Sequence, residues 1–335
     1  MPTRLAKQNN APRRAARGYV ARRWLRRSAI TTGAVAMTLT AGGAVYLGAV
    51  NHNIERADLL SSSAEAKAAV PKSAKGALNI VILGSASQNP DDSDTGRGDV
   101  VMMLHISQDR KSAQLISFPR ATYVQVAGHG MQTLNKTYAL GGAELTVGTL
   151  QQLTKTRVDH VMLADYEGFA ALTQQVGSVT VDNETAFSNL GYSYAKGSIK
   201  LSGAEALAYV KARADGKDAE GDREGRQRAV LEAGLKQGLD RDMLSSPTRL
   251  AAFVNTATSN MTVDKSLTGA AITKIATSLR LKQDDVELVR APLSDEIKTV
   301  DGQEVQEVDA QQFKEFAAAL SSDKVGAYTD EHDSE

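Results

Sequence analysis

Residues 29–50 contain no charged side chain, and this stretch of 22 residues most constrains how the chain can fold. At about 1.5 Å per residue it makes a helix of about 33 Å, long enough to cross the hydrocarbon core of a bilayer. Nine Lys and Arg residues and no acidic residue precede it. Because basic residues stay on the cytoplasmic side of a span, we expect a basic cytoplasmic tail at 1–28 and one transmembrane helix at 29–50. The remainder is then extracytoplasmic, as in a single-pass protein of the cell membrane.

Two other interpretations of the amino-terminal region are weaker. A cleaved signal peptide has an apolar region of only about 7–15 residues, so we expect this longer segment to be retained as an anchor. A basic tail also occurs in proteins that bind nucleic acid. Here the tail directly precedes a span, and topology together with anionic lipid head groups explains its charge. We therefore expect a membrane and no nucleic acid among the partners.

Several classes of chemistry are excluded by the residues that the chain lacks. It contains no cysteine, which rules out disulfides and thiol catalysis. It also lacks the G-x-S-x-G, Walker A and H-E-x-x-H motifs. His105 lies within an apolar run and is expected to be a core residue whose ring nitrogens are hydrogen-bonded. Any catalysis must therefore be built from arginine and aspartate, with or without a metal ion.

The pattern of apolar residues after the span predicts an α/β domain. We expect a stalk at 51–77, one folded domain at 78–322 and an acidic disordered tail at 323–335. Short apolar runs predict strands at 78–83, 100–106, 113–118, 158–164 and 286–289. Helical periodicity is found at 142–154, 166–176, 203–213, 222–239, 246–257, 265–280 and 309–320. Strands that alternate with helices favour a sheet covered by helices, in an α/β or α+β domain of three layers.

Charged residues stand at the ends of two predicted strands. Arg97, Gly98 and Asp99 precede the run at 100–106, and Arg120 follows Pro119 just beyond the run at 113–118. Positions beyond strand ends line ligand crevices in open sheets. For either group alone, a surface charge on a loop is the favoured interpretation.

A second set of polar residues shares the inward face of predicted helices. Arg223 and Gln227 fall on the same helical row as Val230 and Leu231. Buried cations are costly unless something negative meets them, so this row points to an anionic ligand, with solvated helix ends as the alternative. In the helix predicted at 203–213, Lys211 shares such a row with Leu207 and Val210, and Arg213 lies at the edge of that row.

Together these residues predict a phosphate site. Guanidinium groups bind phosphate oxygens in pairs, so several around one cavity suit a pyrophosphate. Asp99 and Glu220 are candidates for holding a divalent cation, which often rests on one or two carboxylates and on phosphate oxygens. Such a site catalyses phosphoryl transfer by positioning and charge neutralisation. The cations expected to converge are Arg97, Arg120, Lys211, Arg213, Arg223 and Arg226.

Seven segments, in order, resemble the LytR-CpsA-Psr family of bacterial cell-envelope proteins. The resemblance covers about residues 78 to 320. The matching segments are NIVILGS, RGD before an apolar strand, SFPRATYV, LNKTYALGG, VDHVMLADYEGF, LSGAEALAYVKAR and EGDREGRQ.

This resemblance implies a three-layer α/β/α domain with a mixed central sheet. It further implies a phosphotransferase that moves a polyprenyl-pyrophosphate-linked glycopolymer (of the teichoic acid, arabinogalactan or capsule type) onto peptidoglycan with Mg²⁺ or Mn²⁺. By the same resemblance Asp99 is the metal ligand, and Arg120, Arg97 and Asp99 are the catalytic residues. The residues that match its pyrophosphate site are Arg97, Arg120, Lys211, Arg213, Arg223 and Gln227.

The chain departs from the family pattern in ways that bear on activity. Ala86 and Ala121 stand where members usually have Asp, and Gln88 stands where they have Arg. Thr133 replaces a common Lys, and Lys211 replaces an Arg. Fewer carboxylates weaken metal binding, and lysine lacks the planar fork of arginine. A second hypothesis is therefore a catalytically weakened paralogue that binds polyprenyl pyrophosphate lipid as an accessory or regulatory protein.

Overall fold

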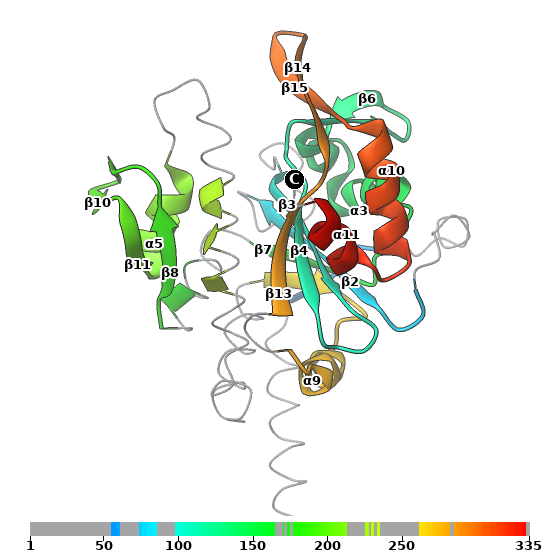
Figure 1. The fold of residues 1–335 in the computed structure, drawn as a ribbon, viewed down its shortest axis with the longest axis horizontal. Coiled ribbons are helices and arrows are strands. Elements are labelled where there is room, and N and C mark those ends of the chain that lie inside the picture. The colour runs from blue at the N-terminus through cyan, green and yellow to red at the C-terminus, as the bar shows by residue number, and fades with distance from the viewer. Residues whose placement is uncertain are drawn as a thin grey trace, which may run out of the picture. The chain divides into compact units, whose positions relative to one another are not determined.

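The apolar runs of the sequence form the strands of a mixed sheet (Figure 1). The structure is a computed structural model that describes residues 55–60, 74–85, 98–164, 170, 173–174, 177–212, 225–227, 229–230, 233–234, 261–281 and 285–332. In spatial order the strands are β1 (Glu55–Ala57), β12 (Met261–Asp264), β7 (His160–Ala164), β2 (Leu78–Ser85), β3 (Gly98–Ile106), β4 (Ala113–Ser117) and β13 (Val286–Arg290). Strand β2 pairs parallel with β7 and antiparallel with β3, so the expected mixed sheet is confirmed.

Both faces of this sheet are covered, because its central strands are apolar on both sides. Alternate residues such as Val81 and Leu83 of β2 face a core built with helices α3 (Leu134–Thr154) and α10 (Ala310–Ser321). Ile80, the residue before Val81, belongs to a second cluster with Ile275 of α9 (Gly269–Ser278). Since successive side chains in a strand point to opposite faces, the helices cover opposite sides of the sheet. This is the arrangement expected for three layers.

A second, smaller sheet is formed by the segments that follow β4 and β13 in the chain. It has the order β14 (Leu293–Val300), β15 (Gln303–Val308), β5 (Thr122–Val126) and β6 (Gly130–Thr133). A turn at residues 301–302 joins β14 and β15 into a hairpin, which projects from the domain in Figure 1. Strands β5 and β6 were not predicted, and β6 leads directly into α3.

Helix α3 contains a break at two glycines. Gly142 has φ +62° and ψ −159°, a conformation that is essentially confined to glycine. A Cβ atom on Gly141 would lie 2.7 Å from Cβ of Leu145. The sequence predicted a helix only from residue 142, and the preceding helical segment from Leu134 was missed. That segment buries Leu134 and Tyr138 in the core.

A separate hydrophobic cluster draws its members from the described residues between Val179 and Val230. It contains β8 (Val179–Asn183), β9 (Phe187–Asn189), β10 (Tyr192–Tyr194), β11 (Gly197–Leu201) and helix α5 (Gly203–Lys211). The helix agrees with the prediction, whereas the two antiparallel strand pairs were not predicted. Tyr194 and Tyr209 are buried in this cluster with their rings 5.1 Å apart.

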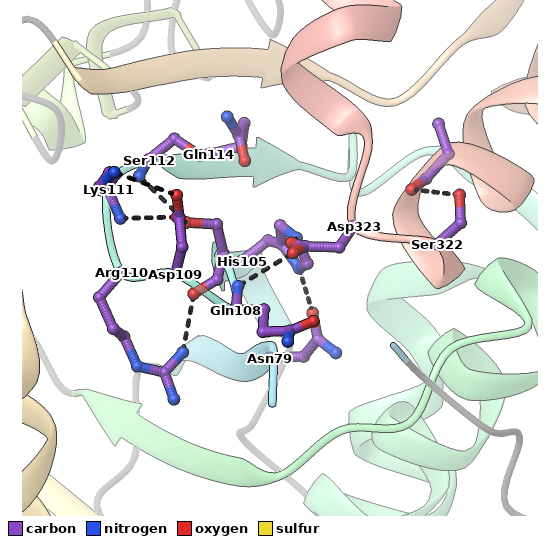
Figure 2. Close-up of polar contacts among 12 residues, drawn as sticks. Asn79, His105, Gln108, Asp109, Arg110, Lys111, Ser112, Gln114, Ser322 and Asp323 are labelled. Atoms are coloured by element: carbon purple, nitrogen blue, oxygen red, sulfur yellow. Dashed lines mark hydrogen bonds and ion pairs between the residues drawn. The ribbon is translucent and has the colours of Figure 1, made fainter. Parts of the chain in front are cut away.

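The carboxy-terminal segment is part of the folded domain. The expectation of a disordered tail at 323–335 differs from the structure, which forms helix α11 (Val325–His332) and buries Val325. Figure 2 shows the contact that holds the preceding turn. Nε2 of buried His105 lies 2.9 Å from Oδ1 of Asp323, and Nδ1 lies 2.7 Å from Oδ1 of Asn79. His105 is therefore a hydrogen-bonded core residue, as predicted.

The amino-terminal expectations meet the structure only in part. Residues 29–50 lie outside the described residues, and among those described no helix is long and apolar enough to cross a membrane. Within the segment expected as a stalk, Glu55–Ala57 pairs with β12 and Leu59 is buried in the core. Strand pairing and the burial of leucine place these residues in the folded domain.

Candidate active site

Asp99 occupies a β-bulge at one end of the central sheet. Gly84 of β2 pairs with Val100 of β3, but the next residue, Ser85, pairs with Gly98. One residue of β3, Asp99, is therefore extra and has no partner position on β2. Bulges of this kind are common beside active sites, where they change the direction of a side chain. For Asp99 the structure describes the backbone only.

Gly84 has a steric reason to be glycine next to this bulge. A Cβ atom at position 84 would lie 2.8 Å from Cβ of Val100, closer than side-chain atoms approach. The two backbones can thus pair tightly where the bulge begins. The glycine in the sequence motif NIVILGS serves strand pairing at the site.

Arg120 lies in a tight turn at the same end of the sheet. The N–H of Phe118 donates to the carbonyl of Val101 at 3.0 Å, so the end of β4 lies beside the start of β3. The N–H of Thr122 then donates to the carbonyl of Pro119 at 3.0 Å and closes the turn. Arg120 is half-buried. Strand pairing thus brings the backbone of Asp99 and the turn of Arg120 to one edge, as the strand-end argument predicted.

Two neighbouring elements hold this turn. The N–H of Asn135, in the first turn of α3, donates to the carbonyl of Arg120 at 3.1 Å. The N–H of Gln306 in β15 donates to the carbonyl of Ala121 at 3.2 Å. Contacts on both sides of the turn fix the backbone from which the Arg120 side chain extends. Ala121 places a methyl group where the family pattern has a carboxylate.

The same edge holds a cation that the sequence reasoning missed. Arg290 pairs with Ser117 at the end of β13, one strand beyond Arg120. Arg290 directly follows the apolar run at 286–289, just as Arg120 follows the run at 113–118. The strand-end argument, applied to every predicted strand, would have found it.

The second group of predicted site residues comprises Lys211 at the end of α5 and Gln227 further along the chain. Gln227 is buried, with 6% of its surface exposed, and Val230 on the same row is 1% exposed. The predicted inward row is confirmed for these two residues. Lys211 is half-buried at the last position of α5. Arg226 lies beside it, where Nη2 donates to the carbonyl of Ala212 at 2.6 Å and the guanidinium lies 5.1 Å from the ring of Phe187.

Four of the predicted residues fall outside the part of the chain that the structure describes. They are Arg97, Arg213, Glu220 and Arg223. The convergence of these cations with Arg120 on one pyrophosphate therefore stays a prediction.

The residues at the sheet edge are compatible with a divalent cation. Within the described ranges, no group of three or more Asp, Glu, His or Cys side chains forms a metal cage. Mg²⁺ does not require such a cage, because it is often bound by one or two carboxylates with phosphate oxygens and water. The backbone of Asp99 lies at this edge, and Asp99 is the residue predicted from the sequence to hold such a cation. This donor set fits a cation that is held jointly by protein and substrate.

A buried carboxylate holds β7, the strand next to β2. Oδ2 of Asp264 accepts hydrogen bonds from the N–H of Val161 at 3.0 Å and from Nδ1 of His160 at 3.1 Å. Oδ1 accepts from the N–H of Ser266 at 2.9 Å and from its hydroxyl. Burial alone would raise the pKa of Asp264, but these bonds hold it below its usual value. The Ser266 hydroxyl also lies 3.2 Å from Nδ1 of His160, the ring nitrogen that contacts Asp264. These hydrogen bonds connect β12 to β7 and so stabilise the sheet.

Curated proteins with similar sequences are named as teichoic acid transferases. The chain is 29% identical over 240 residues to the polyisoprenyl-teichoic acid–peptidoglycan teichoic acid transferase TagU of Bacillus licheniformis, covering 70% of this chain and 74% of the relative. It is 31% identical over 260 residues to TagU of Halalkalibacterium halodurans, covering 73% and 82%.

Solved structures share the fold. TagV of B. subtilis superimposes with a TM-score of 0.63 at 22% identity, covering 75% of this chain and 98% of that one. A structure titled TagT bound to LI-WTA gives a TM-score of 0.57 at 25% identity, covering 74% and 91%. The LytR_cpsA_psr family model matches residues 45–322. The chain therefore belongs to the LytR_cpsA_psr family.

Proposed function

We propose that the chain is a membrane-anchored phosphotransferase that attaches a polyprenyl-pyrophosphate-linked glycopolymer to peptidoglycan. The observation that carries the proposal is the sheet edge at which the Asp99 bulge and the Arg120 turn lie together. The names of the TagU relatives support the reaction class, and the structure of TagT with LI-WTA supports a glycopolymer as ligand. A teichoic acid, an arabinogalactan or a capsule polymer fits this chemistry.

The reaction needs charge neutralisation more than a protein nucleophile. An acceptor hydroxyl of peptidoglycan attacks the sugar-linked phosphorus, and the bond from that phosphorus to the bridging oxygen breaks. A phosphodiester forms, polyprenyl phosphate leaves, and the hydroxyl proton is released. Arg120 binds the pyrophosphate oxygens on which negative charge accumulates. Arg97, Arg213 and Arg223 are proposed to share this role.

The remaining site residues hold and orient the substrate. Asp99 would hold Mg²⁺ or Mn²⁺, which when bound neutralises phosphate charge. Lys211 at the end of α5 adds one further positive charge, and buried Gln227 offers an amide to the phosphate oxygens. The fixed turn around Arg120 reduces the reorganisation needed when charge develops.

The setting of this reaction follows from the amino-terminal sequence. A span at 29–50 with the basic tail inside would place the domain outside the cell membrane. Lipid-linked donor and peptidoglycan acceptor are both accessible there.

A second candidate is a weakened paralogue that binds the lipid pyrophosphate with little turnover. Ala121 favours it, because the turn next to Arg120 carries no carboxylate. Ala86, the other departure, lies outside the described residues. Under this candidate the protein would act as an accessory or competitor of an active enzyme.

One experiment separates the two candidates. The full chain is reconstituted in vesicles with a pyrophosphate-linked lipid donor, and peptidoglycan-bound polymer and released polyprenyl phosphate are measured. The phosphotransferase proposal predicts both products in equal amounts from the unaltered chain. Donor binding without product, converted to transfer by Ala86→Asp together with Ala121→Asp, would establish the weakened paralogue instead.

A further inference from the structure

The hairpin of β9 and β10 presents apolar side chains to solvent. Leu190 at its tip is 70% exposed, and Tyr192 beside it is 37% exposed. Asn189 pairs with Tyr192, so only Leu190 and Gly191 form the turn. Most of the Leu190 side chain is therefore in contact with solvent.

The conformation of Leu190 makes this exposure unusual. Its φ is +49° and that of Gly191 is +84°, as in a type I′ turn. Such turns favour Asn-Gly, and a bulky side chain at positive φ is disfavoured. Leucine at this position is therefore unfavourable in two ways: its apolar side chain is exposed to water, and its backbone has a positive φ. Residues that break local rules in this way mark functional sites more often than elsewhere.

The base of the hairpin is firmly held. The ring of Phe187 lies 4.7 Å from that of Tyr194, and Nδ2 of Asn189 donates to the carbonyl of Ala208 in α5 at 2.7 Å. The hydroxyls of Ser188 and Ser193 lie 3.0 Å apart across the hairpin. The tip thus extends from a packed support rather than collapsing onto it.

The same support carries a proposed substrate-binding residue. Helix α5, to which Asn189 is bonded, ends at Lys211. The hairpin tip and this positive charge are therefore parts of one packed unit. A contact made by the tip would therefore act on the same packed unit that carries Lys211.

We propose that Leu190 and Tyr192 insert into the interfacial region of the bilayer and seat this part of the protein on the membrane. A bilayer accepts an isolated apolar tip without a matching groove, and tyrosine is enriched at the membrane interface. The proposal rests on the proposed function for its membrane setting and adds a second contact besides the predicted span.

The length of the tether supports this occupant. Strand β1 begins at Glu55, five residues after the predicted span ends at Val50. Five extended residues reach at most about 18 Å. If residues 29–50 span the membrane, the folded domain starts within that distance of the bilayer surface.

The test uses the absence of cysteine from the chain. Full chain carrying Ser193→Cys is labelled with an environment-sensitive fluorophore and reconstituted in vesicles of phosphatidylcholine and phosphatidylglycerol. We expect lipid-borne nitroxides to quench this probe and the added Leu190→Asn substitution to reduce the quenching about twofold. The matched control is Ile297→Cys, because Ile297 is 59% exposed on the hairpin of another sheet and should not be quenched.

Three outcomes overturn the proposal. They are absence of quenching at position 193, equal quenching at 193 and 297, and quenching that is unaffected by Leu190→Asn. Protection of the probe that depends on protein concentration rather than on lipid nitroxide would assign the tip to a second copy of the chain. The readout requires no turnover, so its failure is distinct from failure of the phosphotransferase proposal.

Discussion

The backbone N–H of Asn135 donates a hydrogen bond to the carbonyl oxygen of Arg120 at 3.1 Å. This bond joins the turn that carries the candidate catalytic arginine to the first turn of α3. Because the break at Gly141 and Gly142 separates that part of α3 from the rest of the helix, we expect the position of Arg120 to depend on the geometry of the break.

Gly142→Ala should therefore affect both stability and the site. Alanine at φ +62° and ψ −159° is strained, with an expected loss of about 1–3 kcal/mol in the free energy of unfolding. If the break shifts, the turn at Arg120 shifts with it and transfer activity falls. Urea unfolding and the transfer assay measure the two effects.

Gly148 provides the matched control for this substitution. It lies in the regular part of α3, and no atom lies within 4 Å of a Cβ atom added there. Gly148→Ala should leave stability unchanged or raise it by up to about 1 kcal/mol, since alanine is the better helix former. Equal losses from both substitutions would contradict the role assigned to the break.

Asp323→Ala should destabilise the domain by about 2–4 kcal/mol, because it removes a partner from buried His105. The same substitution leaves the N–H of Gln108, which donates to Oδ2 at 3.0 Å, without that acceptor. Burial lowers the pKa of His105, and the Asp323 carboxylate opposes that shift. Chemical denaturation measures the loss.

Asp301 supplies the comparison for Asp323. Both residues have positive φ, of +51° and +62°, but Asp301 is exposed in the turn between β14 and β15. Asp301→Ala reports the backbone cost of alanine at such a position. If Asp323→Ala loses no more unfolding free energy than Asp301→Ala, the contact between Asp323 and His105 contributes nothing to stability.

Asp264→Asn should cost about 2–4 kcal/mol at neutral pH, because the amide nitrogen cannot accept the bonds made to the carboxylate. The pKa of Asp264 is lowered in the folded protein, so the unfolded chain binds its proton more readily. The contribution of the carboxylate is therefore complete above the unfolded pKa and is lost as the pH falls through the folded pKa. The difference in unfolding free energy between wild type and variant should be constant from pH 7 to about pH 5 and shrink below about pH 4. A difference that grows on acidification would contradict this assignment.

Leu190→Asn should raise the free energy of unfolding by about 1 kcal/mol, because asparagine adopts positive φ more readily and leucine is unfavourable there. Thermal unfolding of the two proteins in detergent measures the gain. Ile297→Asn, at an exposed strand position, should give no gain, since asparagine is depleted in strands. Loss of stability in Leu190→Asn would mean that the leucine packs against the folded protein.

The sequence was most informative where apolar runs are short and uninterrupted. The runs that became β2, β3, β4 and β7 fixed the core of the mixed sheet, and the charged residues at their ends marked the edge with Asp99 and Arg120. Burial of Gln227 followed from helical periodicity alone. These features depend on local patterns that persist in the folded chain.

Other features depended on contacts that periodicity does not encode. The strands from β8 to β11 were missed even though Val179, Val181 and Asn183 alternate inward with outward residues, because short polar strands between turns give a weak signal. Helix α11 was predicted to be a disordered tail because its sequence is acidic and polar, and a single buried valine, Val325, gives no helical periodicity. The bulge at Asp99 is a property of the pairing between two strands, so neither strand reveals it alone.

The central claim is that the edge carrying Arg120 performs phosphoryl transfer, and one measurement tests it most directly. Initial rates of polymer transfer to peptidoglycan are compared for wild type, Arg120→Ala and Arg280→Ala in the same vesicles. Arg280 is an exposed arginine whose N–H donates to the carbonyl of Arg110, at the turn between β3 and β4 and so at the opposite end of these strands. The account predicts a loss of about 100-fold or more for Arg120→Ala and an unchanged rate for Arg280→Ala. Undiminished transfer by Arg120→Ala, with a folded protein and an active wild type, would contradict it.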